Sequence, residues 1–300
     1  MYYLCPMFYR RKVILALLEV FGGRLEKIKL QKLLFLVCQN QKKPEYDFIP
    51  YLYGCYSHSA KADLSTMVKK NFLIEDETGY SKKDKKDYLS TLDDEDRKLI
   101  NQTYLLYNKM DGEGLMKHTY TNFPYYAINS TIASRLLSKE QFVKITAIRP
   151  NLSNTTLYTI GYEGISLEAY LNKLIKNDIK VLVDVRNNPL SQKFGFSKSQ
   201  LIRYCEGLNI EYIHFAEVGI QSEYRQELKS QNDYDNLFKS YQDKTLPNTV
   251  TTQQKIFALL REKKRIALTC FEANICQCHR KHLAEAITEL KEWNYELKHI

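Results

Sequence analysis

The second half of the chain alternates short apolar segments with amphipathic ones, and this rhythm restricts its fold more than any other feature. The apolar segments, each of strand length, are LYTIGY (157–162), KVLVDVR (180–186), IEYIHF (210–215), RIALTC (265–270) and YELKHI (295–300). The segments between them carry apolar residues at helical spacing: 167–177, 198–207, 251–263 and 279–292, with a polar helical insertion at 222–243. This alternation predicts a parallel α/β sheet over residues 155–300. The almost continuous apolar run in KVLVDVR indicates a sheet covered on both faces.

The first half has a different pattern. Helical spacing is found at 10–21, 27–38 and 58–72, with an extended aromatic segment, YDFIPYLYGCYS, between the second and third helices. The segment 73–92, LIEDETGYSKKDKKDYLSTL, then predicts a strand, a glycine-containing turn with lysines nearby, and another strand. Three helices followed by a basic hairpin are the outline of a winged helix. We therefore expect a winged-helix-like α+β domain over residues 1–92, with phosphate contacts from Lys82, Lys83, Lys85 and Lys86.

Residues 93–150 return to helical spacing and predict a helical connector between the two domains. Its first residues, Asp93–Asp96, are acids that suit the positive end of a helix dipole. The segment RPNLSNTT (149–156) has Pro, Ser and Asn and no apolar periodicity, so we expect the domain boundary there.

Charge and cysteine content indicate the partners and the compartment. The net charge of +9 is uneven: residues 1–150 hold 24 Lys and Arg against 17 acids, a balance of +7, whereas residues 151–300 hold 20 against 18, a balance of +2. A basic excess of this kind favours nucleic acid as a partner. The chain has seven cysteines without a disulfide-like spacing and no apolar stretch long enough for a signal peptide or membrane span. We expect reduced thiols in a cytoplasmic protein without membrane contact.

The polar residues that follow the predicted strands are expected to share one edge of the sheet. In open parallel sheets, ligands bind outside the carboxyl ends of the strands. Four strand ends deliver polar, charged or nucleophilic residues to that edge: Gly161, Tyr162 and Glu163 after the first strand; Asp184 and Arg186, then Asn187, Asn188 and Pro189, after the second; His214 and Glu217, then Gly219, after the third; Cys270, Glu272, Cys276, Cys278, His279 and Arg280 after the fourth. The sequence therefore predicts a functional pocket there.

Five short motifs in this half resemble a known family. They are TIG at Thr159–Gly161, DVR at Asp184–Arg186 with Pro189, Phe196 with Lys198, Tyr212 and His214 with Glu217 and Gly219, and C-x-E with CHR at Cys270, Glu272 and Cys278–Arg280. In this order they are similar to the family called domain of unknown function 488, over about residues 157–300. Val218 replaces a usual leucine, and Cys276 is additional. The resemblance implies a Rossmann-like α/β fold and no particular activity.

Three kinds of chemistry are open for the loop after RIALTC. Cys270 could be a thiolate nucleophile of rhodanese or phosphatase type, although the ten residues from Cys270 to Arg280 exceed such loops and contain no glycine. Cys276, Cys278 and His279, with Cys270 or His282, could bind zinc, although the C-x-C-H spacing is unusual for that. Alternatively, His279 and Arg280 at a helix start, together with Arg186, could bind phosphate.

We favour the phosphate site. Its ligand-binding residues would be Gly161, Arg186, His279 and Arg280, and its acid–base residues Asp184, Glu217, Glu272 and His214. We assign no metal ligand and no required cofactor, while zinc or another divalent metal stays open. Purely structural roles also stay open: Cys270 as a buried strand end, His214 as a core histidine, and both arginines in salt bridges with Asp184 and Glu272.

The expected function is that of a nucleic-acid-associated protein whose α/β domain binds or processes a nucleotide or a nucleic-acid end, as a hydrolase if it is an enzyme. One alternative is a DNA-binding regulator whose α/β domain senses a ligand without catalysis. The other is a thiol-dependent enzyme of rhodanese or phosphatase type.

Overall fold

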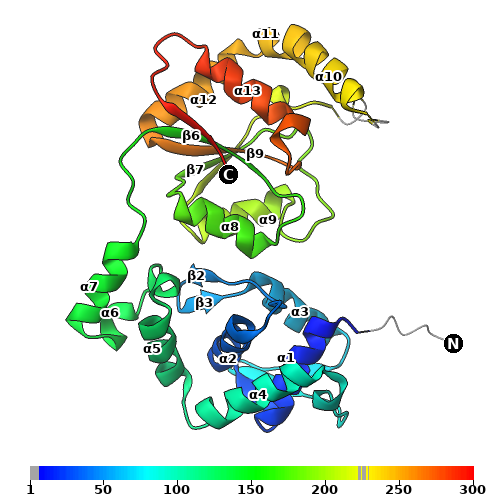
Figure 1. Ribbon diagram of the computed structural model, residues 1–300, viewed down its shortest axis with the longest axis vertical. Coiled ribbons are helices and arrows are strands. Elements are labelled where there is room, and N and C mark those ends of the chain that lie inside the picture. The colour runs from blue at the N-terminus through cyan, green and yellow to red at the C-terminus, as the bar shows by residue number, and fades with distance from the viewer. Residues whose placement is uncertain (1–6, 222–223, 225–227, 229) are drawn as a thin grey trace, which may run out of the picture. The chain divides into compact units, whose positions relative to one another are not determined.

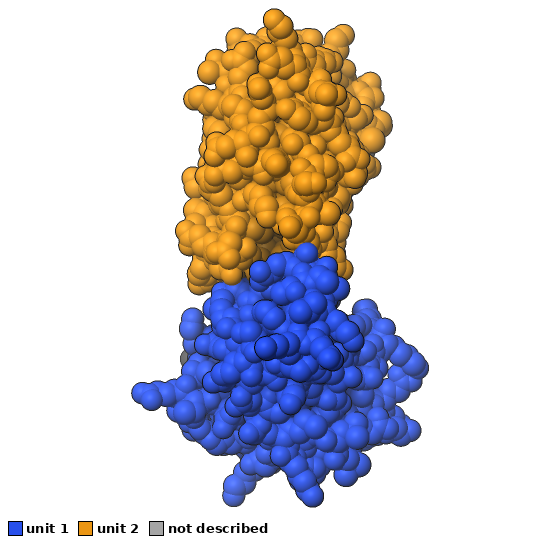
Figure 2. All heavy atoms as spheres, turned by 90° about the vertical axis from the view of Figure 1, so that its left-hand side faces the viewer, with its two compact units in different colours: residues 1–149 blue, residues 150–300 orange. Residues whose placement is uncertain are grey.

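The computed structural model describes residues 7–221, 224, 228 and 230–300, and the chain divides into two compact units (Figure 1). The N-terminal unit is Met1–Arg149 and the C-terminal unit is Pro150–Ile300, shown in separate colours in Figure 2. The boundary lies inside the break predicted at 149–156. Across the described ranges, every helix is too short or too polar to span a membrane.

The N-terminal unit is built from helices around two small antiparallel sheets. Its elements are α1 (Tyr9–Val20), β1 (Arg24–Glu26), α2 (Lys27–Asn40), β2 (Ile49–Tyr51), β3 (Gly54–Tyr56), α3 (His58–Lys69), β4 (Leu73–Glu75), β5 (Gly79–Lys82), α4 (Asp94–Tyr107), α5 (Gly112–Asn122), α6 (Ala133–Leu136) and α7 (Lys139–Ile148). Strands β1, β5 and β4 form one sheet in that order, and β2 pairs with β3. Helices α1 and α2 provide half of the buried residues of its core.

The predicted helical connector is part of this unit rather than a separate segment. Ile100 of α4 and Leu115 of α5 are fully buried in the same core as α1 and α2. The apolar faces that the sequence predicted for residues 93–150 therefore pack onto the N-terminal core.

The basic hairpin differs from its prediction. The two strands are β4 and β5, and the turn between them is the acidic segment Asp76–Thr78 rather than a glycine-containing one. Lys82 is the last residue of β5, and Lys83, Lys85 and Lys86 follow the hairpin. The strand expected at the end of the segment is a single 3-10 turn, Leu89–Thr91.

The four lysines also differ from one another. The Lys82 side chain is only 8% exposed, because its Nζ pairs with Glu19 Oε2 at 2.6 Å and also donates to the carbonyl of Lys86. Lys82 is therefore not available for phosphate, which corrects that part of the prediction. Lys83, Lys85 and Lys86 are exposed.

The order α1-β1-α2-α3-β4-β5 and the sheet order β1-β5-β4 follow the expected winged-helix outline, with the β2–β3 hairpin added between α2 and α3. No further finding identifies this unit, so the winged-helix assignment stays a prediction.

The C-terminal unit is a five-stranded, all-parallel sheet in the order β10-β6-β9-β7-β8. Its elements are β6 (Thr156–Gly161), α8 (Leu167–Lys176), β7 (Val181–Asp184), α9 (Lys198–Glu206), β8 (Glu211–His214), α10 (Gln231–Ser240), α11 (Leu246–Asn248), α12 (Val250–Lys263), β9 (Arg265–Cys270), α13 (His279–Thr288) and β10 (Glu296–His299). This confirms the Rossmann-like α/β prediction.

Helices cover both faces of this sheet, as the apolar strands require. Helices α8 and α9 lie on one face, and α12 and α13 lie on the other (Figure 1). Every residue of β6, β7 and β9 is buried, whereas the edge strands β8 and β10 are partly exposed. The polar insertion predicted at 222–243 lies partly outside the described residues; within them, α10 and a following π-helical turn, Tyr241–Thr245, form it.

Candidate functional site

A crevice opens at the carboxyl edge of the sheet where the strand order reverses. Neighbouring strands β6 and β9 lead into α8 and α13, which lie on opposite faces, so their loops diverge and leave space between them. The space is about 310 Å³, and we call it the rim crevice. Its lining comes from the loops after four strands: Tyr162, Arg186, Asn187, Asn188, Leu190, Ser191, Gln192, Ile220, Cys270 and Phe271. Within the described residues, this lining contains no Asp or Glu.

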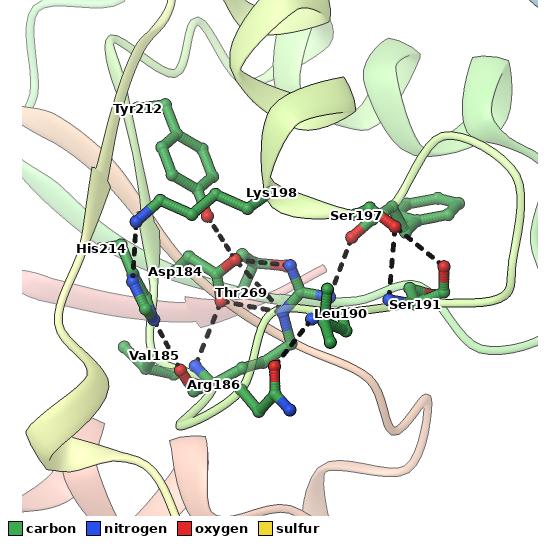
Figure 3. A network of polar contacts seen from close by, with 12 residues as sticks. Asp184, Val185, Arg186, Leu190, Ser191, Ser197, Lys198, Tyr212, His214 and Thr269 are labelled. Atoms are coloured by element: carbon green, nitrogen blue, oxygen red, sulfur yellow. Dashed lines mark hydrogen bonds and ion pairs between the residues drawn. The ribbon is translucent and has the colours of Figure 1, made fainter.

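Asp184 and Arg186 form a buried ion pair at the end of β7. Arg186 Nε donates to Asp184 Oδ1 at 2.9 Å and Nη2 donates to Oδ2 at 2.5 Å, with side chains 6% and 0% exposed (Figure 3). Tyr212 OH donates to the same Oδ2 at 2.6 Å, and the main-chain N–H of Arg186 donates to Oδ1. Burial alone would lower the pKa of Arg186, but hydrogen bonding to Asp184 and its charge outweigh burial and raise it. Asp184 is thus a satisfied acceptor and not a free general base.

The rest of the Arg186 guanidinium is also engaged. Its Nη1 donates to Tyr162 OH at 2.7 Å and to the carbonyl of Phe196 at 2.9 Å. Four of its five N–H donors thus have acceptors in the described structure, and the Tyr212 hydroxyl also lies within hydrogen-bonding reach of the guanidinium. The Tyr162 ring also stacks on Phe196, with ring centroids 4.2 Å apart. Tyr162 is therefore positioned both by its hydrogen bond with Arg186 and by this ring contact.

His214, at the end of β8, has a fixed tautomer. Its Nε2 lies 2.8 Å from the carbonyl of Arg186, which can only accept, so Nε2 carries the hydrogen. Nδ1 then accepts from Lys198 Nζ at 3.2 Å (Figure 3). His214 therefore holds the strand end and the start of α9 in position, and it does not line the rim crevice.

Glu217 faces a different cavity. Its Oε1 accepts from Thr252 Oγ1 at 2.8 Å, and it lines a second cavity of about 320 Å³ that includes Tyr241 and Lys244. The two cavities share Asn187 and Ile220. The sequence predicted one pocket for all the acids, and the structure instead distributes them around the edge of the sheet.

The loop from β9 to α13 brings soft donor atoms together. Cys270, Cys278 and His279 are buried, and their ligand atoms all lie within 4.8 Å of one another. Cys270 Sγ lies 3.7 Å from His279 Nδ1 and donates to Glu272 Oε2 at 3.1 Å. Burial raises the pKa of the Cys278 thiol well above its ordinary value. Cys276 is exposed, because the 3-10 turn Ile275–Gln277 places it outside this group.

Arg280, in the first turn of α13, is 2% exposed. Its Nη1 donates to the carbonyl of Glu272 at 2.5 Å and its Nη2 to that of Ala273 at 3.3 Å, while Nε has no hydrogen-bond partner. Within the described residues, no carboxylate forms an ion pair with it. The alternative of a salt bridge between Arg280 and Glu272 is therefore not observed: Arg280 hydrogen-bonds to the main-chain carbonyl of Glu272 instead of pairing with its carboxylate.

Gly161 allows the loops after β6 and β9 to touch. A Cβ atom at this position would lie 2.0 Å from the carbonyl oxygen of Glu272, which is main chain and cannot move aside easily. The carbonyl of Phe271 accepts from the N–H groups of Tyr162 and Glu163. Gly161 thus allows the loop between β9 and α13, which lies between Cys270 and Cys278, to pack closely against the end of β6.

Residues 166–287 match the family model described as domain of unknown function DUF488. The C-terminal unit contains a DUF488 domain. No curated protein matches the chain. The matched range contains β7, β8, β9 and the loops after them, so it includes Asp184, Arg186 and Tyr212 as well as Cys270, Cys278 and His279, whereas Tyr162 lies before it.

Sequence reasoning placed residues of the DUF488 domain at the correct edge but missed several of its neighbours. Tyr162 and Asn188 were placed at this edge without an assigned role. Tyr212, which bonds to Asp184, was not among the predicted site residues, nor were Ser191 and Gln192. The polar run NNPLSQ, directly after a predicted strand, was the signal that pointed to Ser191 and Gln192. Gly161, His279 and Arg280 lie around the β9–α13 loop and outside the crevice lining.

Proposed function

We propose that the DUF488 domain binds a phosphate-bearing ligand, such as a nucleotide or a nucleic-acid end, in the rim crevice. The observation that carries this proposal is the chemistry of the lining. It combines the positive charge of Arg186 with side-chain amides and a hydroxyl from Asn187, Asn188, Ser191 and Gln192, and its described residues include no carboxylate. Donors without opposing acids favour an anion.

Arg280 supports an anionic ligand near the same edge. A buried guanidinium normally has a paired charge, and this one meets only main-chain carbonyls in the described structure. It belongs to the first turn of α13, where the helix dipole is positive and where Arg280 and Lys281 add to the charge. An anion bound at this end of the sheet would neutralise both the Arg280 guanidinium and the positive end of the α13 dipole.

The proposal is one of binding. Asp184 is saturated by Arg186 and Tyr212, and His214 is fixed between Arg186 and Lys198, so neither is poised as an acid or base. We extend the proposal to nucleic acid because Lys83, Lys85 and Lys86 are exposed in an N-terminal half with a charge of +7.

The test uses the full chain and three probes: inorganic phosphate, a nucleoside triphosphate, and a fluorescent single-stranded oligonucleotide with either a 5′-phosphate or a 5′-hydroxyl. The informative variant is Gln192→Glu, which adds a negative charge to the crevice lining with little change in shape. Its control is Gln254→Glu, the same change at an exposed position of α12.

We expect a phosphorylated probe to bind, and Gln192→Glu to weaken that binding about tenfold through charge repulsion while Gln254→Glu leaves it unchanged. Anisotropy and isothermal calorimetry would measure this. Equal binding by both variants, or no binding of any phosphorylated probe, would end the proposal.

A further inference from the structure

The thiol cluster, which consists of Cys270, Cys278 and His279, has the composition of a metal site. Its three side chains come from the last residue of β9, the residue before α13 and the first residue of α13. All three are at most 1% exposed. Two thiols and one imidazole, with ligand atoms within 4.8 Å of each other, are soft and borderline donors of the kind that select zinc.

The spacing of the donors agrees with tetrahedral coordination. With Zn–S of about 2.3 Å and Zn–N of about 2.05 Å, a tetrahedral angle separates sulfur from nitrogen by about 3.6 Å. Cys270 Sγ and His279 Nδ1 are 3.7 Å apart. This sulfur–nitrogen separation therefore suits a shared zinc ion, and the separations from Cys278 Sγ are within 4.8 Å.

The histidine is oriented as a ligand. Its Nε2 lies 3.0 Å from the carbonyl of Val185, so Nε2 carries the hydrogen and the Nδ1 lone pair points to the thiols. Metal-binding histidines typically donate their other N–H to a carbonyl or carboxylate in this way. The Val185 carbonyl follows β7, and Cys270 ends the adjacent strand β9, so two neighbouring strands position the ring.

The loop between the ligands is also held in place. Arg280 donates to the carbonyls of Glu272 and Ala273, and the Asn274 side chain accepts from the N–H of Cys276. Because these bonds fix both ends of the loop, Cys270 and Cys278 stay together before any ion binds. The rim crevice reaches Cys270, which provides an entry path.

We propose that Cys270, Cys278 and His279 bind one Zn²⁺ ion at the carboxyl end of β9, with the fourth tetrahedral position open to solvent or ligand. Three protein ligands with an open position are the arrangement found in catalytic rather than purely structural zinc sites. Glu272 lies beside the site, since its Oε2 is 3.1 Å from Cys270 Sγ, but it is outside the group of three. The inference goes beyond phosphate binding and does not depend on it.

The test is the metal content and cobalt spectrum of the full chain, purified without a histidine tag and without chelators. We expect about one zinc per chain by elemental analysis. Replacement by Co²⁺ should give the visible bands of a tetrahedral ion and the near-ultraviolet band of thiolate coordination. Cys270→Ser and Cys278→Ser should each remove much of the thiolate band. Cys276→Ser is the matched control from the same loop and should change neither readout.

A measurement on the unmodified chain covers the case in which a variant does not fold. Alkylation followed by mass spectrometry should label the exposed Cys276 at once, and label Cys270 and Cys278 much faster after a chelator is added. Burial alone would protect them equally with and without chelator. The proposal fails if the chain holds no zinc and gives no thiolate–cobalt band, if Cys276→Ser acts like the other two variants, or if Cys270 and Cys278 are found joined in a disulfide.

Discussion

Two buried arginines at the same edge of the sheet differ in what surrounds them. Arg186 donates to a buried carboxylate, a tyrosine hydroxyl and a carbonyl, and little of its hydrogen-bonding capacity is left. Arg280 meets two carbonyls and leaves Nε without a partner. The same residue type at the same edge therefore serves two purposes: Arg186 completes a structural network, whereas Arg280 keeps a positive charge that the described residues do not neutralise.

The N-terminal unit repeats this contrast with lysines. Lys82 is paired with Glu19 and almost buried, whereas Lys83, Lys85 and Lys86 are exposed a few residues away. In both units the basic residues divide into members that stabilise the fold and members whose charge the described residues do not neutralise. Removing one of each kind should separate the two roles.

The largest effect is expected for Arg186→Ala. It would leave Asp184 buried with only Tyr212 and one main-chain N–H as donors, and breaking a buried pair in this way costs about 3–5 kcal/mol of folding free energy. Urea unfolding followed by tryptophan fluorescence would measure it, because Trp293 is the single tryptophan and lies in the C-terminal unit. The exposed Arg203→Ala is the control, with a change below about 0.5 kcal/mol. A cost below about 1 kcal/mol for Arg186→Ala would show that the pair is not a structural network.

Arg280→Met is expected to lose less stability than Arg186→Ala, but to lose more of the binding of a phosphorylated probe. Methionine retains most of the apolar stem, no buried acid loses its partner, and the loss of donors to two carbonyls should cost about 1–2 kcal/mol. Binding of a phosphorylated probe should fall at least about tenfold, since the uncompensated charge is gone. The same unfolding curve and an anisotropy titration would test this. If the variant unfolds as easily as Arg186→Ala and still binds the probe, the contrast between the two arginines is wrong.

The smallest effect on stability is expected for the combined change of Lys83, Lys85 and Lys86 to Ala. These side chains are exposed, so the free energy of unfolding should change by less than about 0.5 kcal/mol. Binding to duplex DNA should weaken, and the dependence of log K on log salt should become shallower by up to about 0.9 for each lost phosphate contact. Changing the exposed Lys98, Lys109 and Lys117 of the same unit to Ala is the control. Equal salt slopes for the two triple variants would remove the nucleic-acid role of this segment.

The strands of the DUF488 domain could be predicted from the sequence because burial on both faces leaves an unmistakable apolar run. RIALTC was predicted at 265–270 and is β9. The predicted helix 279–292 ends earlier, at Thr288, where the chain turns and Glu292 adopts a positive φ. The segment 73–92 was predicted to end in a strand; Tyr88 and Leu92 near its end are buried, but the chain between them forms the 3-10 turn Leu89–Thr91.

The site was harder to predict, because sequence gives the edge of the sheet but not the partners of a side chain. Nothing in DVR shows that Arg186 turns back onto Asp184 and is thereby neutralised. Spacing alone also grouped Cys276 with Cys278 and His279. The 3-10 turn at Ile275–Gln277 rotates Cys276 outward and brings in Cys270 from the preceding strand.

The position of β9 has a consequence for the order in which the domain can form. It is the middle strand of the sheet, paired with β6 on one side and β7 on the other, yet it is the fourth of the five strands along the chain. During synthesis, β6 and the β7–β8 pair thus emerge with no strand to join them, and closing the sheet must await residues 265–270. Such long-range pairing is entropically slow. Cys270 ends that same strand, with Cys278 and His279 only a loop behind it, so the groups that could bind an ion arrive together with the strand that completes the fold.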